Sequence, residues 1–281
     1  MVAHDKLEWG RDVQRWNADV FSHPGAGFVR WLLGVQVERE RSATDLVLSQ
    51  RVRVGRTQDT PAFERLAFVE WLRSRQSLAS GEVADAQAAS ANLHLVLRRL
   101  DNVLLPTRGV SLSLQWGLGQ ARSTQGGVGP YTRLQGRLTG YLPLGAQWYA
   151  KARVEVGQIV KRDALVVPDA LGFRAGGDES VRGYAYRSLA PVVNGHVVSG
   201  NTLLTASAEL ARPISADWPA LWGALFVDAG RATDRWQDFK PALGYGAGLR
   251  WRSPIGPVRV DLAWADELRK ARLHLGVGVS F

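Results

Sequence analysis

The chain has 281 residues, 46% of them hydrophobic, and a net charge of +9 with 35 lysine and arginine residues. It has no cysteine, which excludes disulfides and thiolate metal sites. The positive charge makes nucleic acid a partner to consider, but the arginines stand singly in alternating segments instead of clustering on one helix or tail, and we expect no nucleic-acid partner. No apolar run approaches the roughly 18–20 residues of a membrane-spanning helix.

The amino terminus, which begins Met1-Val-Ala-His-Asp-Lys, lacks the apolar core of a signal peptide. We therefore expect that the start of the chain is truncated. Segments 6–20 and 62–75 alternate irregularly between polar and apolar residues. Residues 76–90, rich in alanine and serine, are predicted to form a surface loop with a helical turn at most.

Most of the remaining chain alternates with a period of two, the pattern of a half-buried strand. The alternating segments are 31–39, 45–54, 91–97, 111–118, 132–140, 148–156, 203–210, 221–229, 243–252, 258–264 and 272–281. Their polar faces carry Arg, Glu, Gln and Gly, which fits a hydrated lumen better than the lysine-rich surface of a soluble sandwich.

The last segment shows the clearest alternation. Its apolar residues share one parity over ten residues, the length that crosses a bilayer as a tilted strand. These residues are Leu273, Leu275, Val277, Val279 and Phe281. The repeated pattern predicts an all-β fold, an antiparallel transmembrane β-barrel with about 12 or 13 strands, and no long helix.

One long connection, from about 158 to 202, interrupts the strands, and loops beyond roughly 12–15 residues are unusual unless functional. Arg182 lies at its middle and can reach the interior of a barrel, where an unpaired cation would cost several kcal/mol. Asp228 stands within an apolar strand, a position that requires pairing, and Glu209 lies on the polar face of 203–210. We predict an Arg182–Asp228 bridge assisted by Glu209; the alternative is a surface arginine and a turn aspartate that never meet.

The run Val181-Arg-Gly-Tyr resembles the lid motif of the BamA/TamA superfamily of outer-membrane assembly barrels, and Phe226-Val-Asp-Ala-Gly resembles the strand motif that receives its arginine. Over 101–281, including the turn at 105–109 and the hairpin at 251–257, the chain is most similar to TamA-type barrels. The resemblance implies lid residues Gly176, Gly177, Asp178, Val181, Arg182, Gly183 and Tyr184. It implies lid-receiving residues Glu209, Phe226, Asp228 and Gly230, and Phe281 resembles the aromatic terminal signal of such barrels.

By this resemblance, residues 1–281 form the barrel domain of a bacterial outer-membrane protein with 16 strands, here lacking its first three or four strands and its POTRA domains. The lid would be an extracellular loop folded inward. The implied function is insertion and assembly of client outer-membrane proteins or autotransporters, through a weakly zipped seam near residues 272–281. The implied partners are outer-membrane lipids, the clients and an inner-membrane-anchored protein that spans the periplasm.

Other functions stay open. A two-partner secretion transporter would export a dedicated partner through the same lumen, and a passive pore or a soluble β-protein forms another class. An enzyme is not expected, since Gly244-x-Gly246-x-Gly248 continues as an alternating strand with no helix after it. The five histidines show no metal-ligand spacing, so no metal or cofactor is expected.

Overall fold

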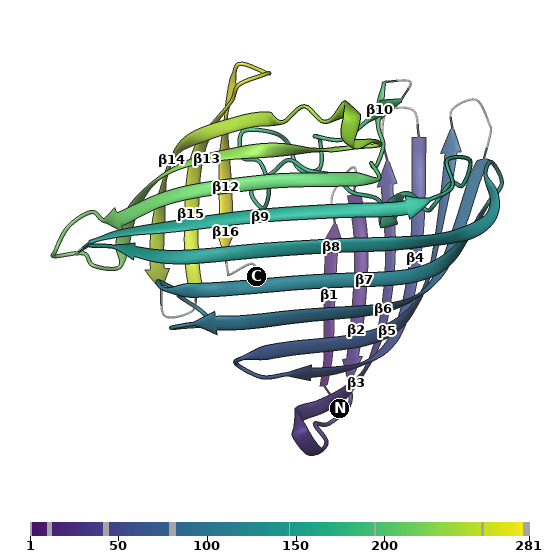
Figure 1. The fold of residues 1–281 in the computed structure, drawn as a ribbon, viewed down its shortest axis with the longest axis horizontal. Helices are drawn as coiled ribbons and strands as arrows, with labels where there is room; N and C mark the ends of the chain where they lie inside the picture. The colour runs from purple at the N-terminus through teal and green to yellow at the C-terminus, as the bar shows by residue number, and fades with distance from the viewer. Residues whose placement is uncertain are drawn as a thin grey trace. The chain divides into compact units, whose positions relative to one another are not determined.

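The computed structural model describes residues 2–9, 13–41, 45–78, 83–145, 147–193, 195–253 and 256–277. Within these ranges, fourteen strands follow one another in chain order in a single sheet, and a separate two-stranded hairpin lies in the connection between β9 and β12 (Figure 1). Each pairing with an assigned register is antiparallel. In the described ranges no helix is long and apolar enough to cross a membrane.

The chain divides into two compact units, and the first comprises Met1–Leu95, Gln115–Leu134 and Ile159–Gly172. Five strands lie wholly within it: β1 (Val2–Trp9), β2 (Val13–Phe21), β3 (Val29–Arg41), β4 (Asp45–Asp59) and β5 (Phe63–Leu78). Its core is a cluster of buried side chains from strands and from the segment after β9. These residues are Leu72, Ala88, Ala121, Tyr131, Leu165 and Leu171.

The boundaries between the units fall within four strands: β6 (Val83–Leu100), β7 (Gly109–Ser123), β8 (Gly127–Leu144) and β9 (Trp148–Lys161). The second unit holds the rest: the hairpin β10 (Val192–Val193) and β11 (His196–Val197), then β12 (Thr202–Pro213), β13 (Leu221–Thr233), β14 (Ala242–Ser253), β15 (Gly256–Ala265) and β16 (Lys270–Val277).

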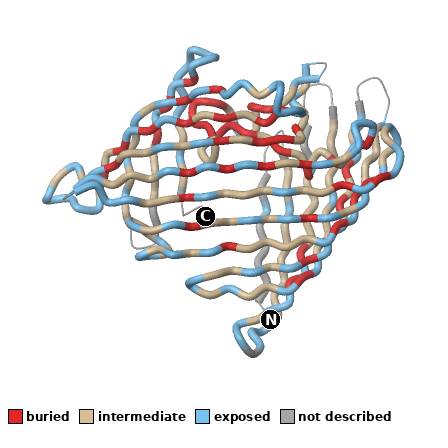
Figure 2. The backbone as a smooth tube through the Cα atoms, in the orientation of Figure 1, coloured by how far each residue is buried: buried red, intermediate tan, exposed pale blue. Residues whose placement is uncertain are grey.

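Burial in the second unit follows the alternation of the sequence. Along β13, Phe226 and Asp228 are buried, whereas Leu225 and Val227 are 60% and 49% exposed. Buried residues gather in the loop that precedes β12 and alternate with exposed ones along the strands (Figure 2). A sheet whose outward residues are exposed and apolar fits a lipid environment, because water would penalise so large an apolar surface.

Two predictions about the elements were wrong. In the part of the chain that the structure describes, the sheet has fourteen strands instead of about 12 or 13, because the single irregular segment 6–20 contains parts of two strands, β1 and β2. The predicted loop at 76–90 contains the end of β5 and the start of β6, with residues 79–82 outside the described ranges. Alanine and serine alternate only weakly in polarity, so this part of β6 lacked a period-two signal, although Asp85 pairs there with Arg73.

Candidate functional site

The segment between β9 and β12 contains a turn that is closed by hydrogen bonds between its own residues. Gly176, Gly177 and Gly183 have φ of +101°, +103° and +95°, which favours glycine because a side chain would clash there. The Gly177 amide donates to the Val181 carbonyl, and the Gly176 amide donates to Ser180 Oγ. This turn belongs to residues 173–201 of the second unit, which we call the lid segment.

Arg182 projects from this turn onto Asp228 of β13. Its Nε donates to Asp228 Oδ2 at 2.7 Å, its Nη2 donates to Oδ1 at 2.9 Å, and its backbone amide donates to Oδ2 at 3.0 Å. The guanidinium also lies 3.5 Å from the ring centroid of Phe226. Such a two-pronged contact is the strongest geometry for an arginine and a carboxylate, and the aromatic face adds a cation–π interaction.

Two further carboxylates and a second arginine complete what we call the arginine cluster. Arg182 Nη1 donates to Glu209 Oε2 at 3.0 Å and to Asp261 Oδ2 at 3.2 Å. Arg250 donates to Glu209 Oε1 at 2.9 Å and to Asp261 Oδ1 at 2.6 Å. Arg182 is 5% exposed, and Asp228 and Asp261 are 1% exposed each. The cluster thus links four consecutive strands, β12 to β15, to the lid segment.

The charge of Arg182 is secured by its surroundings. Burial alone would lower its pKa, but the hydrogen bonds and charge of Asp228, together with the charges of Glu209 and Asp261, raise the pKa above its ordinary value. Arg182 therefore stays protonated at any physiological pH, and it acts as a fixed cation instead of a proton donor or acceptor.

Two glycines of β14 lie where a side chain would not fit, one against the lid segment and one against an acid of the arginine cluster. A Cβ atom at Gly244 would lie 1.9 Å from the carbonyl oxygen of Arg182, and one at Gly248 would lie 1.9 Å from Asp261 Oδ1. The register places Gly244 opposite Asp228, so the acid and the space for the arginine backbone are adjacent. The glycine run that superficially suggests a dinucleotide loop is thus part of a strand, and its first glycine, Gly244, lies against the lid segment.

The lid segment also contacts the last two strands and the turn between them. The Gly183 amide donates to His274 Nε2 of β16 at 2.9 Å. The Tyr184 hydroxyl donates to the Leu243 carbonyl at 3.1 Å and accepts from the Glu267 amide at 3.2 Å. Arg259 of β15 pairs with Asp178 and Glu179 of the lid segment.

The structure brings together most of the residues that were predicted to receive the lid arginine. The structure brings Glu209, Phe226 and Asp228 around Arg182, and it buries Val181 and Tyr184 beside them. Gly230 is placed against β12: its φ is +156°, and a Cβ there would lie 2.5 Å from the Leu204 carbonyl oxygen.

Of the predicted terminal signal, Leu273 and Leu275 are exposed, at 59% and 69%. The backbone of Val277 pairs with Val258, and its side chain lies outside what the structure describes. Val279 and Phe281 lie entirely outside the described residues.

Sequence reasoning missed three participants in the cluster and its surroundings: Asp261, Arg250 and His274. Asp261 carries the same signal as Asp228, a carboxylate within an apolar strand, and could have been found by the same argument. His274 lies within the predicted strand 272–281, but no pattern in the sequence pairs it with a backbone amide of the lid segment.

The fold and the arginine cluster define a class, the non-enzymatic β-barrels that carry a lid bound to their wall. Residues 33–281 match the model of the Omp85 superfamily domain, and the chain belongs to this superfamily.

Two similar curated proteins are from Arabidopsis thaliana. Outer envelope protein 80, chloroplastic, is 33% identical over 137 residues, which cover 44% of this chain and 16% of that protein. Outer envelope protein 39, chloroplastic, is 34% identical over 116 residues, which cover 37% of this chain and 29% of that protein. The matches thus span less than a third of each relative.

Two solved structures show the same fold. BamA from Haemophilus ducreyi lacking POTRA domains 1–3 matches with a TM-score of 0.74 at 17% identity, covering 95% of this chain and 62% of that one. CdiB from Escherichia coli matches with a TM-score of 0.57 at 13% identity, covering 95% of this chain and 52% of that one. At these identities the likeness shows the fold alone: an all-β antiparallel barrel.

Proposed function

We propose that this chain is the barrel domain of a TamA-type assembly factor, which inserts client outer-membrane proteins or autotransporters into a bacterial outer membrane. The observation that carries the proposal is the buried bridge between Arg182 of the lid segment and Asp228 of the sheet. Arg182 belongs to the run that resembles the lid motif of this superfamily, and the likeness in fold to BamA supports an assembly factor.

In this proposal the lid segment sets the geometry of the barrel wall and takes no part in covalent chemistry. The guanidinium of Arg182 makes five hydrogen bonds, one from Nε, two from Nη1 and two from Nη2, and their acceptors are Asp228, Glu209, Asp261 and Ser207. The same segment reaches β16 through His274. A lid that binds both the wall and β16 would fix the position of the strand beside the proposed seam, with which a client strand would pair.

The setting of the protein belongs to the proposal. We place the barrel in a bacterial outer membrane, with lipids, clients and an inner-membrane-anchored protein as partners. The names of the Arabidopsis relatives make the chloroplast outer envelope the other candidate membrane. POTRA domains before this barrel domain also remain a prediction.

The proposal is tested by replacing Arg182 with alanine in the full-length protein. Removing one partner of a buried ion pair costs about 3–5 kcal/mol, because the remaining charges stay buried. We expect Arg182→Ala to lower the assembly of an autotransporter reporter while part of the barrel still folds. Heat-modifiable migration would measure the folded fraction, so that assembly can be expressed per folded barrel.

Two variants accompany the test. Arg182→Lys keeps the charge but loses the planar fork, so it should restore assembly only in part. Arg122→Ala removes an exposed arginine of β7 and should leave assembly unchanged. Normal assembly by a folded Arg182→Ala protein would contradict the proposal.

A two-partner secretion transporter is the second candidate, and the fold likeness to CdiB favours it. Its barrel would pass a dedicated partner protein instead of inserting clients. Conductance bursts in a planar bilayer that depend on a purified secreted partner, with no effect on client assembly, would favour this candidate over the first.

A further inference from the structure

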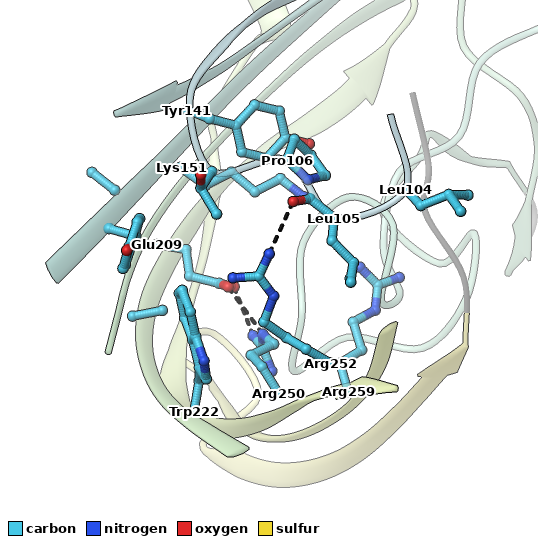
Figure 3. A pocket seen from close by; sticks show the side chains of 14 residues that line it. Leu104, Leu105, Pro106, Tyr141, Lys151, Glu209, Trp222, Arg250, Arg252 and Arg259 are labelled. Carbon is cyan, nitrogen blue, oxygen red and sulfur yellow. Dashed lines mark hydrogen bonds and ion pairs between the residues drawn. The ribbon is translucent and has the colours of Figure 1, made fainter. Parts of the chain in front are cut away.

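A cavity of about 150 Å³ opens on the face of the second unit's sheet that carries the arginine cluster. Side chains of β8, β9 and β12 to β15 line one side, and the turn Leu104–Thr107 between β6 and β7 lines the other (Figure 3). By the rough allowance of about 10–15 Å³ per water position, it has room for a small organic group and not for a folded segment.

The walls of this cavity carry an excess of positive charge. Four cationic side chains line it, from Lys151, Arg250, Arg252 and Arg259, against the single carboxylate of Glu209. Arg250 is matched by Glu209 and Asp261, and Arg259 is matched by acids of the lid segment. The excess therefore rests on Lys151 and Arg252.

Lys151 lies directly opposite Glu209 in the register of β9 and β12. The two do not form an ion pair, since Glu209 directs its oxygens to Arg182 and Arg250. Lys151 Nζ instead lies 5.6 Å from the ring centroid of Tyr141. Among the described residues no carboxylate lies within ion-pair distance of this ammonium group.

Arg252 is in a similar position. Its Nη2 donates to the Leu105 carbonyl at 2.9 Å, and its guanidinium lies 4.6 Å from the ring centroid of Trp222. Neither contact neutralises its charge, and no acid in the described part of the chain pairs with it. In Figure 3 Lys151 and Arg252 both extend from the sheet toward the turn that carries Leu105.

The turn opposite these cations is held by hydrogen bonds from its own amides to one acid, Asp101. Asp101 accepts hydrogen bonds from the Thr107 amide at 3.0 Å and from the Arg108 amide at 3.0 Å. Burial alone would raise the pKa of Asp101, but the hydrogen bonds from Thr107 and from backbone amides lower it to about 2. The turn therefore presents Leu104, Leu105 and Pro106 as a fixed apolar wall.

We propose that this cavity binds a small carboxylate that carries an apolar portion. The carboxylate would accept hydrogen bonds from Lys151 and Arg252, whose charges have no acid of their own, and the apolar portion would lie against Trp222 and Leu105. Two cations that line one cavity favour an anion, because a counter-charge offsets the cost of their partial burial. The apolar wall distinguishes an organic acid from an inorganic anion.

The test is calorimetric titration of the full chain, refolded in detergent, with hexanoate as the probe. Saturable binding of hexanoate is expected, with neutral hexanamide and inorganic phosphate each about tenfold weaker. N-acetylleucine stands in for a peptide chain end; tighter binding than hexanoate would assign the site to a chain terminus, and weaker binding would assign it to a free acid. Each of these two results supports the site.

Variants separate the site from general charge effects. Lys151→Met and Arg252→Gln should each weaken hexanoate binding about tenfold, whereas Lys151→Arg should retain it. Lys270→Met, a matched change at an exposed lysine of β16, should have no effect. Heat-modifiable migration would confirm that each variant is folded.

Three results would overturn the inference. If both Lys151→Met and Arg252→Gln bind hexanoate as tightly as the unchanged protein does, neither residue binds the carboxylate. Equal binding of hexanoate and hexanamide would remove the role of charge. Tighter binding of phosphate than of hexanoate would remove the role of the apolar wall.

Discussion

Arg182 illustrates how a single side chain can join residues that are far apart in the sequence. Its planar guanidinium presents donors in fixed directions, so it can meet Asp228 with two bonds and still reach Glu209 and Asp261. A lysine would offer one compact charge and could satisfy only part of this arrangement. The role of Arg182 is therefore structural: it holds the lid segment to the strands that carry these carboxylates.

A test at the residue scale concerns Gly244, whose lack of a side chain leaves space for the backbone of Arg182. Gly244→Ala would place a methyl group 1.9 Å from the Arg182 carbonyl oxygen, so we expect a loss of about 2–3 kcal/mol in unfolding free energy from overpacking. Denaturant titration of the refolded barrel would measure it.

The matched control is Gly140→Ala in β8, where a Cβ atom would meet nothing within 4 Å. Its unfolding free energy should stay close to that of the unchanged protein. Equal stability of the two variants would show that the lid segment does not press on β14.

Sequence reasoning reached part of this site. An acid within an apolar strand and an arginine in an overlong loop indicate a pair, and Asp228 and Arg182 do meet. The same argument predicted two acids, Asp228 and Glu209, for one cation. The structure adds Asp261 and a second cation, Arg250, which pairs with both Glu209 and Asp261. The alternation along 258–264 places Asp261 on the polar face of its strand, but alternation alone does not show which charged side chains pair with one another.

At the scale of elements, the lid segment couples the wall to the final strand. The Gly183 amide is bound to His274 Nε2, and the Tyr184 hydroxyl is bound to β14 and to the turn before β16. Because a hydrogen bond joins the lid segment directly to β16, the strand at the proposed seam, a change that frees one of them should increase local opening in both.

His274→Leu tests this coupling by removing the acceptor of the Gly183 amide. An unpaired buried amide costs about 1–3 kcal/mol, so we expect faster hydrogen exchange at Gly183 and along β16. His274→Gln retains an acceptor and should protect these amides in part.

The control for this prediction is His23→Gln, at an exposed histidine of the first unit. It should leave the exchange of β16 unchanged. If His274→Leu also leaves the exchange of Gly183 and β16 unchanged, the lid segment and the last strand are not coupled through this bond.

Considered as a whole molecule, the chain exposes an apolar face that water would not stabilise. Leu225, Val227, Leu243 and Leu249 are all more than two-fifths exposed on neighbouring strands, as expected for residues that contact lipid. The family match over 33–281 agrees with this interpretation.

Val227→Arg tests the lipid contact. A cation near the bilayer midplane of a barrel strand costs about 2–4 kcal/mol, so unfolding from phospholipid vesicles should need correspondingly less denaturant. Leu268→Arg, in the exposed turn between β15 and β16, should cost under about 1 kcal/mol. Equal costs at the two positions would contradict a lipid-facing β13.

The sequence by itself determined the class of fold and the faces of the strands. Alternation is a local property, since successive side chains of a strand must point to opposite faces, so Phe226 and Asp228 could be assigned to one face without a structure. The same local signal failed at 76–90, where alanine and serine differ too little in polarity to mark the two faces.

Tertiary structure alone decided which residues meet across the sheet. The register sets Asp228 beside Ser207 and Gly244, and the lid segment brings Gly183 to His274. These contacts join residues separated by long stretches of chain, and no period in the sequence encodes them. They depend on how strands pair and how a loop closes, which only the assembled sheet determines.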